Sequence, residues 1–309
     1  GWASRDGAEL GTSRHLPRGG HFDMIADQIE KHRLDGLLMV GGWAGYQACY
    51  DLHRAAEDNV RLRIPIVCMP ASINNDLPGS ELSIGADTAL NNIVQDVDKI
   101  KQSAVASGRC FVVEVMGKDS GYLALMSGLA TGAERVYLPE EGISLADLEA
   151  DVTSLKIGFR LGKRLGLVIT SENSDPVYDS GFIKQLFERE SEGLFSVRQS
   201  ILGHIQQGGD PSPFDRIQAT RLSAKSLEHL IDHVLRDTPT SCLIGLEHGK
   251  IRFTRLDDFP ELIEHDVQRP IEQSWMALRP LAIQMGLVDV PTTRKSHKGN
   301  IPLIGGMSI

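Results

Sequence analysis

The chain has 309 residues, a formal net charge of −9 and 41% hydrophobic residues. This length predicts about two domains with a sizeable core. The acidic balance excludes a general attraction to nucleic acid or to anionic membranes. No apolar run is long enough to cross a bilayer and no signal peptide is visible. The four cysteines form no C-x-x-C pair, which favours free, buried thiols in a reducing cytoplasm over disulfides or a metal site.

Short apolar runs alternate with helical patterns along the chain. The runs cover residues 36–42, 64–70, 110–116, 165–170 and 241–246. None of them alternates strictly between polar and apolar residues, which is typical of strands that are buried on both faces of a parallel sheet. Strands separated by helices predict an α/β fold.

Apolar residues spaced three and four positions apart predict two amphipathic helices. Their apolar stripes comprise Ala86, Leu90, Ile93, Val97 and Ile100 in the first helix, and Ile217, Ala224, Leu227, Ile231 and Val234 in the second. Pro213 and Asp215 suit the first turn of the second helix. Residues 289–309 are largely polar and indicate a solvated tail. The chain begins with Gly1 in a polar stretch, which indicates a fragment or a processed chain.

Small, glycine-rich polar loops follow the predicted strands at 41–45, 70–79, 116–122, 171–173 and 203–209. Because parallel α/β sheets bind ligands beyond the carboxyl ends of their strands, we expect these loops to converge on one face. Glycines let backbone N–H groups approach an anion closely. Each loop taken alone is equally typical of a simple or capped turn. The 41–45 segment lacks the G-x-G-x-x-G spacing, so a dinucleotide site is disfavoured.

A few side chains near these loops suit an anionic sugar ligand. Arg109 opens a predicted strand and Arg198 precedes one, and arginine is well shaped for bidentate phosphate contact. Glu172 could accept hydrogen bonds from sugar hydroxyls. Each of these residues, like His204, is alone more typical of a surface or a satisfied polar position. Their occurrence together favours a binding site.

The order of the motifs resembles the ATP-dependent phosphofructokinases. The matching segments are Gly-Gly at 41–42, P-A-S-I-N-N-D-L-P-G at 70–79, G-A-D-T-A at 85–89, E-V-M-G at 114–117, S-G-Y at 120–122 and G-H-I-Q-Q-G-G at 203–209. The resemblance runs from about residue 1 to residue 287. It implies a phosphofructokinase-like α/β fold with two Rossmann-like three-layer domains and mostly parallel sheets. The sugar phosphate would lie between them, in a site completed by a neighbouring subunit.

The resemblance also implies domain boundaries. The first domain would comprise residues 1–85 and 206–275, without the family's N-terminal strand. The second would comprise residues 86–205 and 276–288, and residues 289–309 would form a flexible tail.

The chain departs from catalytic family members at three places. Trp43 stands where they carry an Asp that serves magnesium and nucleotide, and an indole cannot coordinate a hard cation. Asn74 stands where they carry the Asp that acts as general base, and an amide has no titratable oxygen. Asp76 keeps the second acidic position. The glycine-rich phosphate loop that opens the family's first strand is also missing.

These departures resemble the C-terminal, regulatory half of the duplicated eukaryotic enzymes. The resemblance implies a glycolytic, allosteric, cytoplasmic 6-phosphofructokinase whose catalytic half phosphorylates fructose 6-phosphate with ATP and Mg. This half would bind no cofactor or metal of its own, and its ligand would be the activator fructose 2,6-bisphosphate, or fructose 6-phosphate. Its partners would be the catalytic half and further copies in an oligomer, expected to be a tetramer, with no nucleic acid or membrane.

Two alternatives remain open. The first is an active phosphofructokinase domain that uses ATP or pyrophosphate, for which Asp76 is the main support. The second is a structural half that binds no ligand and supports oligomerisation.

The effector site is carried over residue by residue. It comprises Arg14, Ser72, Ile73, Asn74, Asn75, Asp76, Arg109, Met116, Gly117, Lys118, Glu172, Arg198, His204, Ile205, Gln206, Gln207 and Arg269. Arg269 fits only with a shift of one residue, and Gln268 is the alternative. Lys118 stands where the family usually has Gly or Arg. By the same resemblance, Arg109 and Arg198 are expected to serve the site of an adjacent subunit.

Overall fold

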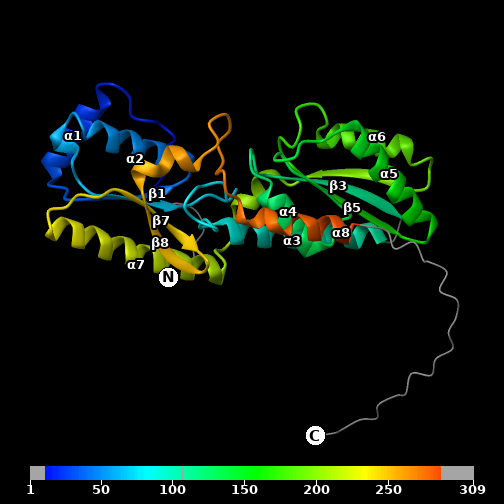
Figure 1. Ribbon diagram of the computed structural model, residues 1–309. Coiled ribbons are helices and arrows are strands. Elements are labelled where there is room, and N and C mark those ends of the chain that lie inside the picture. Colours follow the sequence, from blue (N-terminus) through cyan, green and yellow to red (C-terminus); the bar gives the residue numbers. More distant parts are fainter. Residues whose placement is uncertain (1–10, 106–107, 287–309) are drawn as a thin grey trace, which may run out of the picture.

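The computed structural model describes residues 11–105 and 108–286, and these form two four-stranded sheets that lie side by side (Figure 1). The strands of the first sheet are, in spatial order, β1 (Leu37–Gly41), β2 (Ile66–Pro70), β7 (Cys242–Glu247) and β8 (Lys250–Arg255). Strands β1, β2 and β7 are parallel, and β8 returns antiparallel to β7. Every residue of β2 is buried, as expected for a central strand between two layers of helices.

Helices cover both faces of the first sheet (Figure 1). Helices α1 (His21–His32) and α2 (Trp43–Ala55) lie on one face, and α7 (Pro213–Leu235) lies on the other. The α1–α2 side buries a core that includes Tyr46, Leu62 and Phe259. The α7 side buries a smaller core around Val67 and Leu222.

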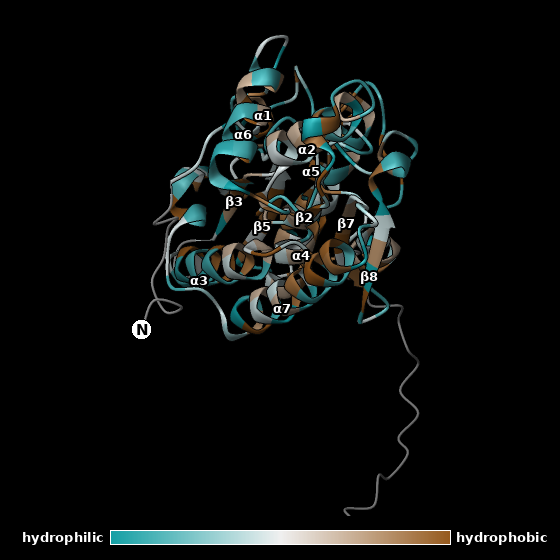
Figure 2. Cartoon of the chain, turned by 90° about the vertical axis from the view of Figure 1, so that its left-hand side faces the viewer, coloured by the Kyte–Doolittle hydropathy of each residue, from teal (hydrophilic) through white to brown (hydrophobic). Residues whose placement is uncertain are grey.

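The second sheet is entirely parallel, in the spatial order β4 (Arg135–Tyr137), β5 (Leu165–Ser171), β3 (Arg109–Val115) and β6 (Ser196–Ile201). Helices α3 (Ala86–Val105), α4 (Tyr122–Thr131) and α8 (Arg279–Met285) cover one face, and α5 (Leu145–Arg160) and α6 (Ser180–Glu190) cover the other (Figure 1). The view along the molecule shows apolar residues concentrated on the strands between these layers (Figure 2).

Short 3-10 helices and one buried carboxylate connect these elements. The 3-10 helices are η2 (Val60–Leu62), η3 (Gly203–Gln207), η4 (Leu256–Leu262) and η5 (Ser274–Leu278).

Asp215 of α7 is only 2% exposed and accepts hydrogen bonds from the Gly85 and Thr88 amides, at 2.9 and 2.8 Å, and from the Thr88 hydroxyl. A negative charge at the N-terminus of α3 is favourable. This carboxylate therefore ties α3 to α7, across the junction of the two sheets.

The predicted fold class is confirmed, and each predicted apolar run overlaps a strand. The first predicted helix is also confirmed, because Ala86, Ile93 and Val97 of α3 are fully buried. All four cysteines are free and buried. Within the described residues, every helix is too short or too polar to span a bilayer. The division into two discontinuous domains stays a prediction, and the proposed tail lies outside the described residues.

The second predicted helix is also present as α7, but its apolar stripe does not face the core. On α7, Ile217 and Ile231 are 60% and 58% exposed, whereas Gln218, Leu222 and Ser226 face the sheet. Ser226 can be buried because its hydroxyl donates to the Leu222 carbonyl one turn earlier, at 2.8 Å. Helical spacing therefore identified the helix but not the side of it that faces the core.

Candidate functional site

The loop after β2 is organised around the buried carboxylate of Asp76, which is 4% exposed. The Ser72 hydroxyl donates to one of its oxygens at 2.6 Å, and the Asn74 side-chain amide donates to the other at 3.3 Å. Burial raises the pKa of Asp76, although these hydrogen bonds and the positive charge of Lys118 oppose the shift. Asn74, which the sequence predicts to replace a catalytic base, is thus a hydrogen-bond donor to Asp76.

Asn75 fixes the shape of the same loop. Its side-chain amide donates to the Glu81 carbonyl at 2.9 Å, and its side-chain oxygen accepts from the Ser83 amide at 2.7 Å. Its backbone is left-handed, with φ of 52°, a conformation that asparagine tolerates better than most residues. The loop is therefore held from both sides before any ligand binds.

The loop after β3 is bound by Glu172, which follows β5. One carboxylate oxygen of Glu172 accepts from the amides of Gly117, at 3.1 Å, and Lys118, at 2.9 Å. A Cβ atom at Gly117 would lie 2.2 Å from the Ser120 carbonyl oxygen, so this position requires glycine. These two amides neutralise part of the Glu172 charge and leave its second oxygen available for a hydroxyl.

The 3-10 helix η3 supplies the next wall. Gln206 is 1% exposed, accepts from the Met116 amide at 3.1 Å and donates to the Gly203 carbonyl at 2.8 Å. The Gln207 side-chain amide lies 3.5 Å from the Met116 sulfur. His204 on the same element is exposed. Gln206 is thus a structural support, while its neighbours face solvent.

A further loop, from η4 toward η5, reaches the site through Lys118. The Lys118 ammonium donates to the Gln268 side-chain oxygen at 2.5 Å and lies 3.4 Å from an Asp119 oxygen. Arg269 pairs with Glu264 and donates to the Asp119 carbonyl at 3.3 Å. The loops that follow β2, β3 and β5, together with η3 and this segment, therefore meet at the junction of the two sheets (Figure 1).

Two predicted arginines lie elsewhere. Arg109 begins β3, whose far end carries the Met116 loop, and six steps of about 3.3 Å along the strand separate them by about 20 Å. Arg198 lies inside β6 opposite Phe111, so the expectation that it precedes a strand is wrong. It is exposed on an edge strand, and its guanidinium donates to the Val197 carbonyl at 3.0 Å. The described contacts also do not join Arg14, which is exposed ahead of α1, to the loops.

Trp43 points into the core and away from the loops. It begins α2, packs against Phe259 with ring centroids 6.1 Å apart, and belongs to the core of the first sheet. Its position offers no oxygen to a cation. Within residues 11–105 and 108–286, no three His, Cys, Asp or Glu side chains come together as metal ligands.

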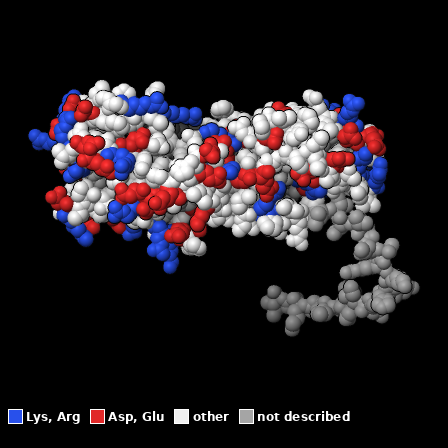
Figure 3. All heavy atoms as spheres, turned by 45° about the horizontal axis from the view of Figure 1, so that its top comes forward, with Lys and Arg blue, Asp and Glu red and all other residues white. Residues whose placement is uncertain are grey.

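Two acidic residues near the site were missed by the sequence analysis. Glu140 accepts the Gly121 amide with both oxygens, at 3.0 and 3.1 Å, and burial raises its pKa. Glu264 pairs with Arg269. Glu140 follows β4, whose three residues are too few to show a pattern, and Glu264 lies in an irregular segment. Figure 3 shows Asp and Glu side chains near the middle of one face and also over its left-hand part.

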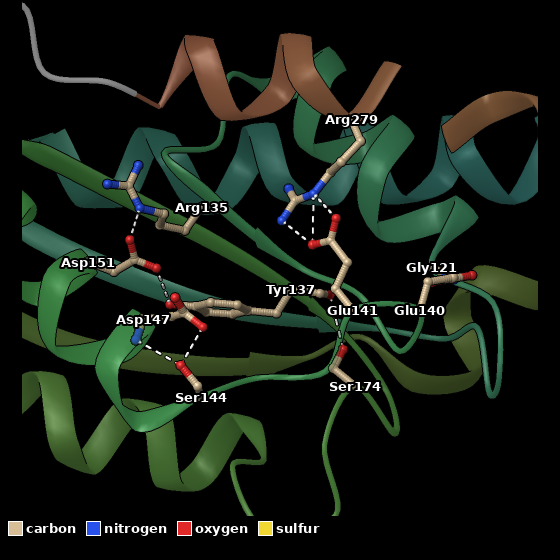
Figure 4. Close-up of polar contacts among 10 residues, drawn as sticks. All are labelled: Gly121, Arg135, Tyr137, Glu140, Glu141, Ser144, Asp147, Asp151, Ser174 and Arg279. Atoms are coloured by element: carbon tan, nitrogen blue, oxygen red, sulfur yellow. Dashed lines mark hydrogen bonds and ion pairs between the residues drawn. The ribbon is translucent and has the colours of Figure 1, made fainter. Parts of the chain in front are cut away.

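A cavity of about 340 Å³ lies away from these loops, between β4, α5 and α8. Four of its charged groups form two ion pairs, and Asp147 contacts Ser144 (Figure 4). Arg135 pairs with Asp151, which also accepts the Tyr137 hydroxyl at 2.8 Å, and Arg279 forms a bidentate pair with Glu141. No free charge is left in these pairs to select a ligand.

Comparisons with known proteins agree with the motif order. The phosphofructokinase family model matches residues 1–230. An ATP-dependent 6-phosphofructokinase of Dictyostelium discoideum is 43% identical over 281 residues, which cover 90% of this chain and 34% of that protein. The human muscle-type enzyme is 36% identical, over 97% of this chain and 40% of its own length. The T-state crystal structure of the Pichia pastoris enzyme superposes with a TM-score of 0.87 at 39% identity, over 93% of this chain and 34% of that one. The chain thus spans about a third to two fifths of these relatives.

Proposed function

Because the chain belongs to the phosphofructokinase family, we propose that it is the regulatory, C-terminal half of an ATP-dependent 6-phosphofructokinase and binds fructose 2,6-bisphosphate without transferring phosphate. The hydrogen bond from the Asn74 amide to Asp76 carries the proposal. An amide cannot accept a proton from a sugar hydroxyl near neutral pH, so this loop can hold a sugar but lacks its general base. In this proposal ATP and Mg are bound by the catalytic half.

Different loops contact the sugar and the phosphates of the ligand. Ser72 to Asp76, Met116 to Lys118 and the second oxygen of Glu172 face the sugar, and His204 to Gln207 close one side. Lys118, His204 and Arg14 supply positive charge for the phosphates. Arg109, at the opposite end of β3, and Arg198, exposed on the edge strand β6, serve the site of an adjacent copy in a cytoplasmic tetramer. Binding then links subunits, and a ligand that prefers one subunit arrangement shifts the equilibrium toward it.

Calorimetric titration of the folded chain with fructose 2,6-bisphosphate and fructose 6-phosphate tests the proposal. We expect saturable binding, no turnover with ATP, and weaker binding after Arg109→Ala or Arg198→Ala. Arg189→Ala, at an exposed position of α6, changes the same charge and serves as a control. Absence of heat with both sugar phosphates, at concentrations well above those of the cell, would refute the proposal.

Asp76 supports a second candidate, an active kinase domain. Its carboxyl has a raised pKa and lies in the loop that catalytic members use. Phosphorylation of fructose 6-phosphate by ATP or pyrophosphate, abolished by Asp76→Ala, would establish this activity. Product formation that survives Asp76→Ala would point to a contaminating enzyme.

A further inference from the structure

Residues 264–269, here called the Gln268 loop, are closed at their base by an ion pair. Ile263 and Pro270 form an isolated antiparallel bridge, and the Glu264 amide donates to the Arg269 carbonyl at 3.0 Å. The Arg269 guanidinium donates to both oxygens of the Glu264 carboxylate, at 2.9 and 3.0 Å. A parallel pair of charge-assisted bonds gives both strength and a fixed geometry.

Arg269 has few donors left for a ligand. Its third nitrogen donates to the Asp119 carbonyl at 3.3 Å, and its side chain is only 15% exposed. The Glu264 contact and the nearby charges of Glu140 and Asp119 raise its pKa. A phosphate that approached this guanidinium would meet three carboxylates around it and would be repelled by them.

Gln268 occupies the exposed position next to Arg269 and faces the site loop. Its side-chain oxygen accepts from the Lys118 ammonium at 2.5 Å, and the Lys118 amide is held by Glu172. The Gln268 loop is thus attached to the Met116 to Asp119 segment at two points. One is the Arg269 contact with the Asp119 carbonyl, and the other is the contact between Gln268 and Lys118.

We propose that Glu264 and Arg269 form a clasp that positions Gln268 and Lys118 at the sugar-phosphate site. Arg269 is then a positioning residue that does not contact phosphate. This inference rests on the proposed function, because it assigns roles at the same site. It also settles the choice between Arg269 and Gln268 that the sequence left open, in favour of Gln268 as the residue that faces the ligand.

The alternative role of Arg269 predicts the opposite sign for one variant. If Arg269 bound phosphate directly, Glu264 would compete with the ligand for the guanidinium, and Glu264→Gln would tighten binding. If the pair is a clasp, Glu264→Gln loosens the Gln268 loop and weakens binding. The two roles also predict different results for the double variant. If Glu264 and Arg269 act through one contact, the losses of binding free energy of the two single variants do not add up in the double variant.

The experiment is a double-mutant cycle with Glu264→Gln, Arg269→Gln and the double variant, read by calorimetric titration with fructose 2,6-bisphosphate. Arg279 and Glu141 provide a matched control pair in the cavity of Figure 4. This pair is also bidentate, and its side chains are 16% and 39% exposed, against 15% and 37% for Arg269 and Glu264. Arg279→Gln and Glu141→Gln therefore remove a similar interaction away from the Gln268 loop.

We expect each single clasp variant to weaken binding by on the order of ten-fold, and the double variant to be no weaker than the singles. The control variants should keep the affinity of the unmodified chain. Tighter binding by Glu264→Gln would overturn the clasp. A double variant whose loss of affinity equals the two single losses combined would also overturn it.

Hydrogen exchange at the Glu264 amide provides a reading that needs no ligand. It should accelerate in Glu264→Gln and stay unchanged in Glu141→Gln, because only the first variant opens the loop. Unchanged exchange in Glu264→Gln would overturn the clasp. Absence of sugar-phosphate binding by the unmodified chain would instead refute the proposed function, and exchange would still decide whether the clasp exists.

Discussion

Gly117→Ala should damage both the stability of the protein and its ligand site. The new methyl carbon would lie 2.2 Å from the Ser120 carbonyl oxygen and 2.4 Å from the Ser171 hydroxyl, against ordinary contacts of at least 3.4 Å. The backbone must therefore move by about 1 Å, and overpacking of this kind costs about 1–3 kcal/mol. The same movement pulls the Gly117 amide from Glu172, and each hydrogen bond to a charged group contributes about 1.5–3 kcal/mol. We expect a total loss of about 3 kcal/mol or more.

Urea unfolding measures this loss directly, and calorimetric titration measures its effect on the site. Gly208→Ala is the matched control, because it lies in the neighbouring loop, has negative φ and has no atom within 4 Å of the added carbon. This control should change the free energy of unfolding by less than about 0.5 kcal/mol. A Gly117→Ala variant as stable as the Gly208→Ala control, with unaltered binding, would refute the role of the Glu172 contacts in shaping the loop.

Two further predictions concern Asp76 and α7. Burial raises the pKa of Asp76 above 3.8, so its contribution to stability is fully present below that pH and is lost as the pH rises through the raised value. The difference in free energy of unfolding between Asp76→Asn and the unmodified chain should therefore shift in favour of the variant as the pH rises from 3 to 7, as measured by urea unfolding. The same difference at both pH values would contradict this. On α7, Leu230→Ala should lose about 2–4 kcal/mol, whereas Ile231→Ala, at an exposed position, should lose less than about 0.5 kcal/mol in thermal or urea unfolding. Equal losses would mean that the outer stripe is covered in solution.

The site loops could be predicted from the sequence because buried parallel strands leave a recognisable pattern of residues. Buried strands need continuous apolar runs, and their carboxyl ends need small residues where the backbone turns toward a ligand. The loops at Ser72, Gly117, Glu172 and Gln206 were all recognised in this way, and hydrogen bonds join the loop of Met116 and Gly117 to Gln206 and to Glu172. Gln268 and Arg269 could be placed near that site only because the motif order resembles a known family.

What the sequence could not predict depended on long-range packing. Strand β4 has only three residues, which is too short for a recognisable strand pattern, so nothing in the sequence pointed to Glu140 after it. Arg198 lies in β6, whose exposed edge breaks the apolar run that marks central strands. The outer stripe of α7 has the same spacing as a core stripe, and only the pairing of Ser226 and Asp215 with backbone groups explains why the polar face is buried.

In the proposed function, the charge of the site links ligand binding to the association of subunits. The loops of a single chain bring together the carboxylates of Asp76, Glu172 and Glu264, and the clasp consumes the charge of Arg269. Lys118 remains as the cation that described contacts join to these loops, and with Arg14 and His204 it would offset only part of the roughly four negative charges of the proposed bisphosphate. In the proposed function the remaining charge comes from an adjacent copy. Arg109 lies about 20 Å from the loops, at the opposite end of β3, and Arg198 is exposed on the edge strand β6. If Arg109 and Arg198 supply this positive charge, the affinity for the sugar phosphate depends on the assembly of subunits. Any change that separates the subunits then weakens ligand binding, even where it alters no residue of the loops.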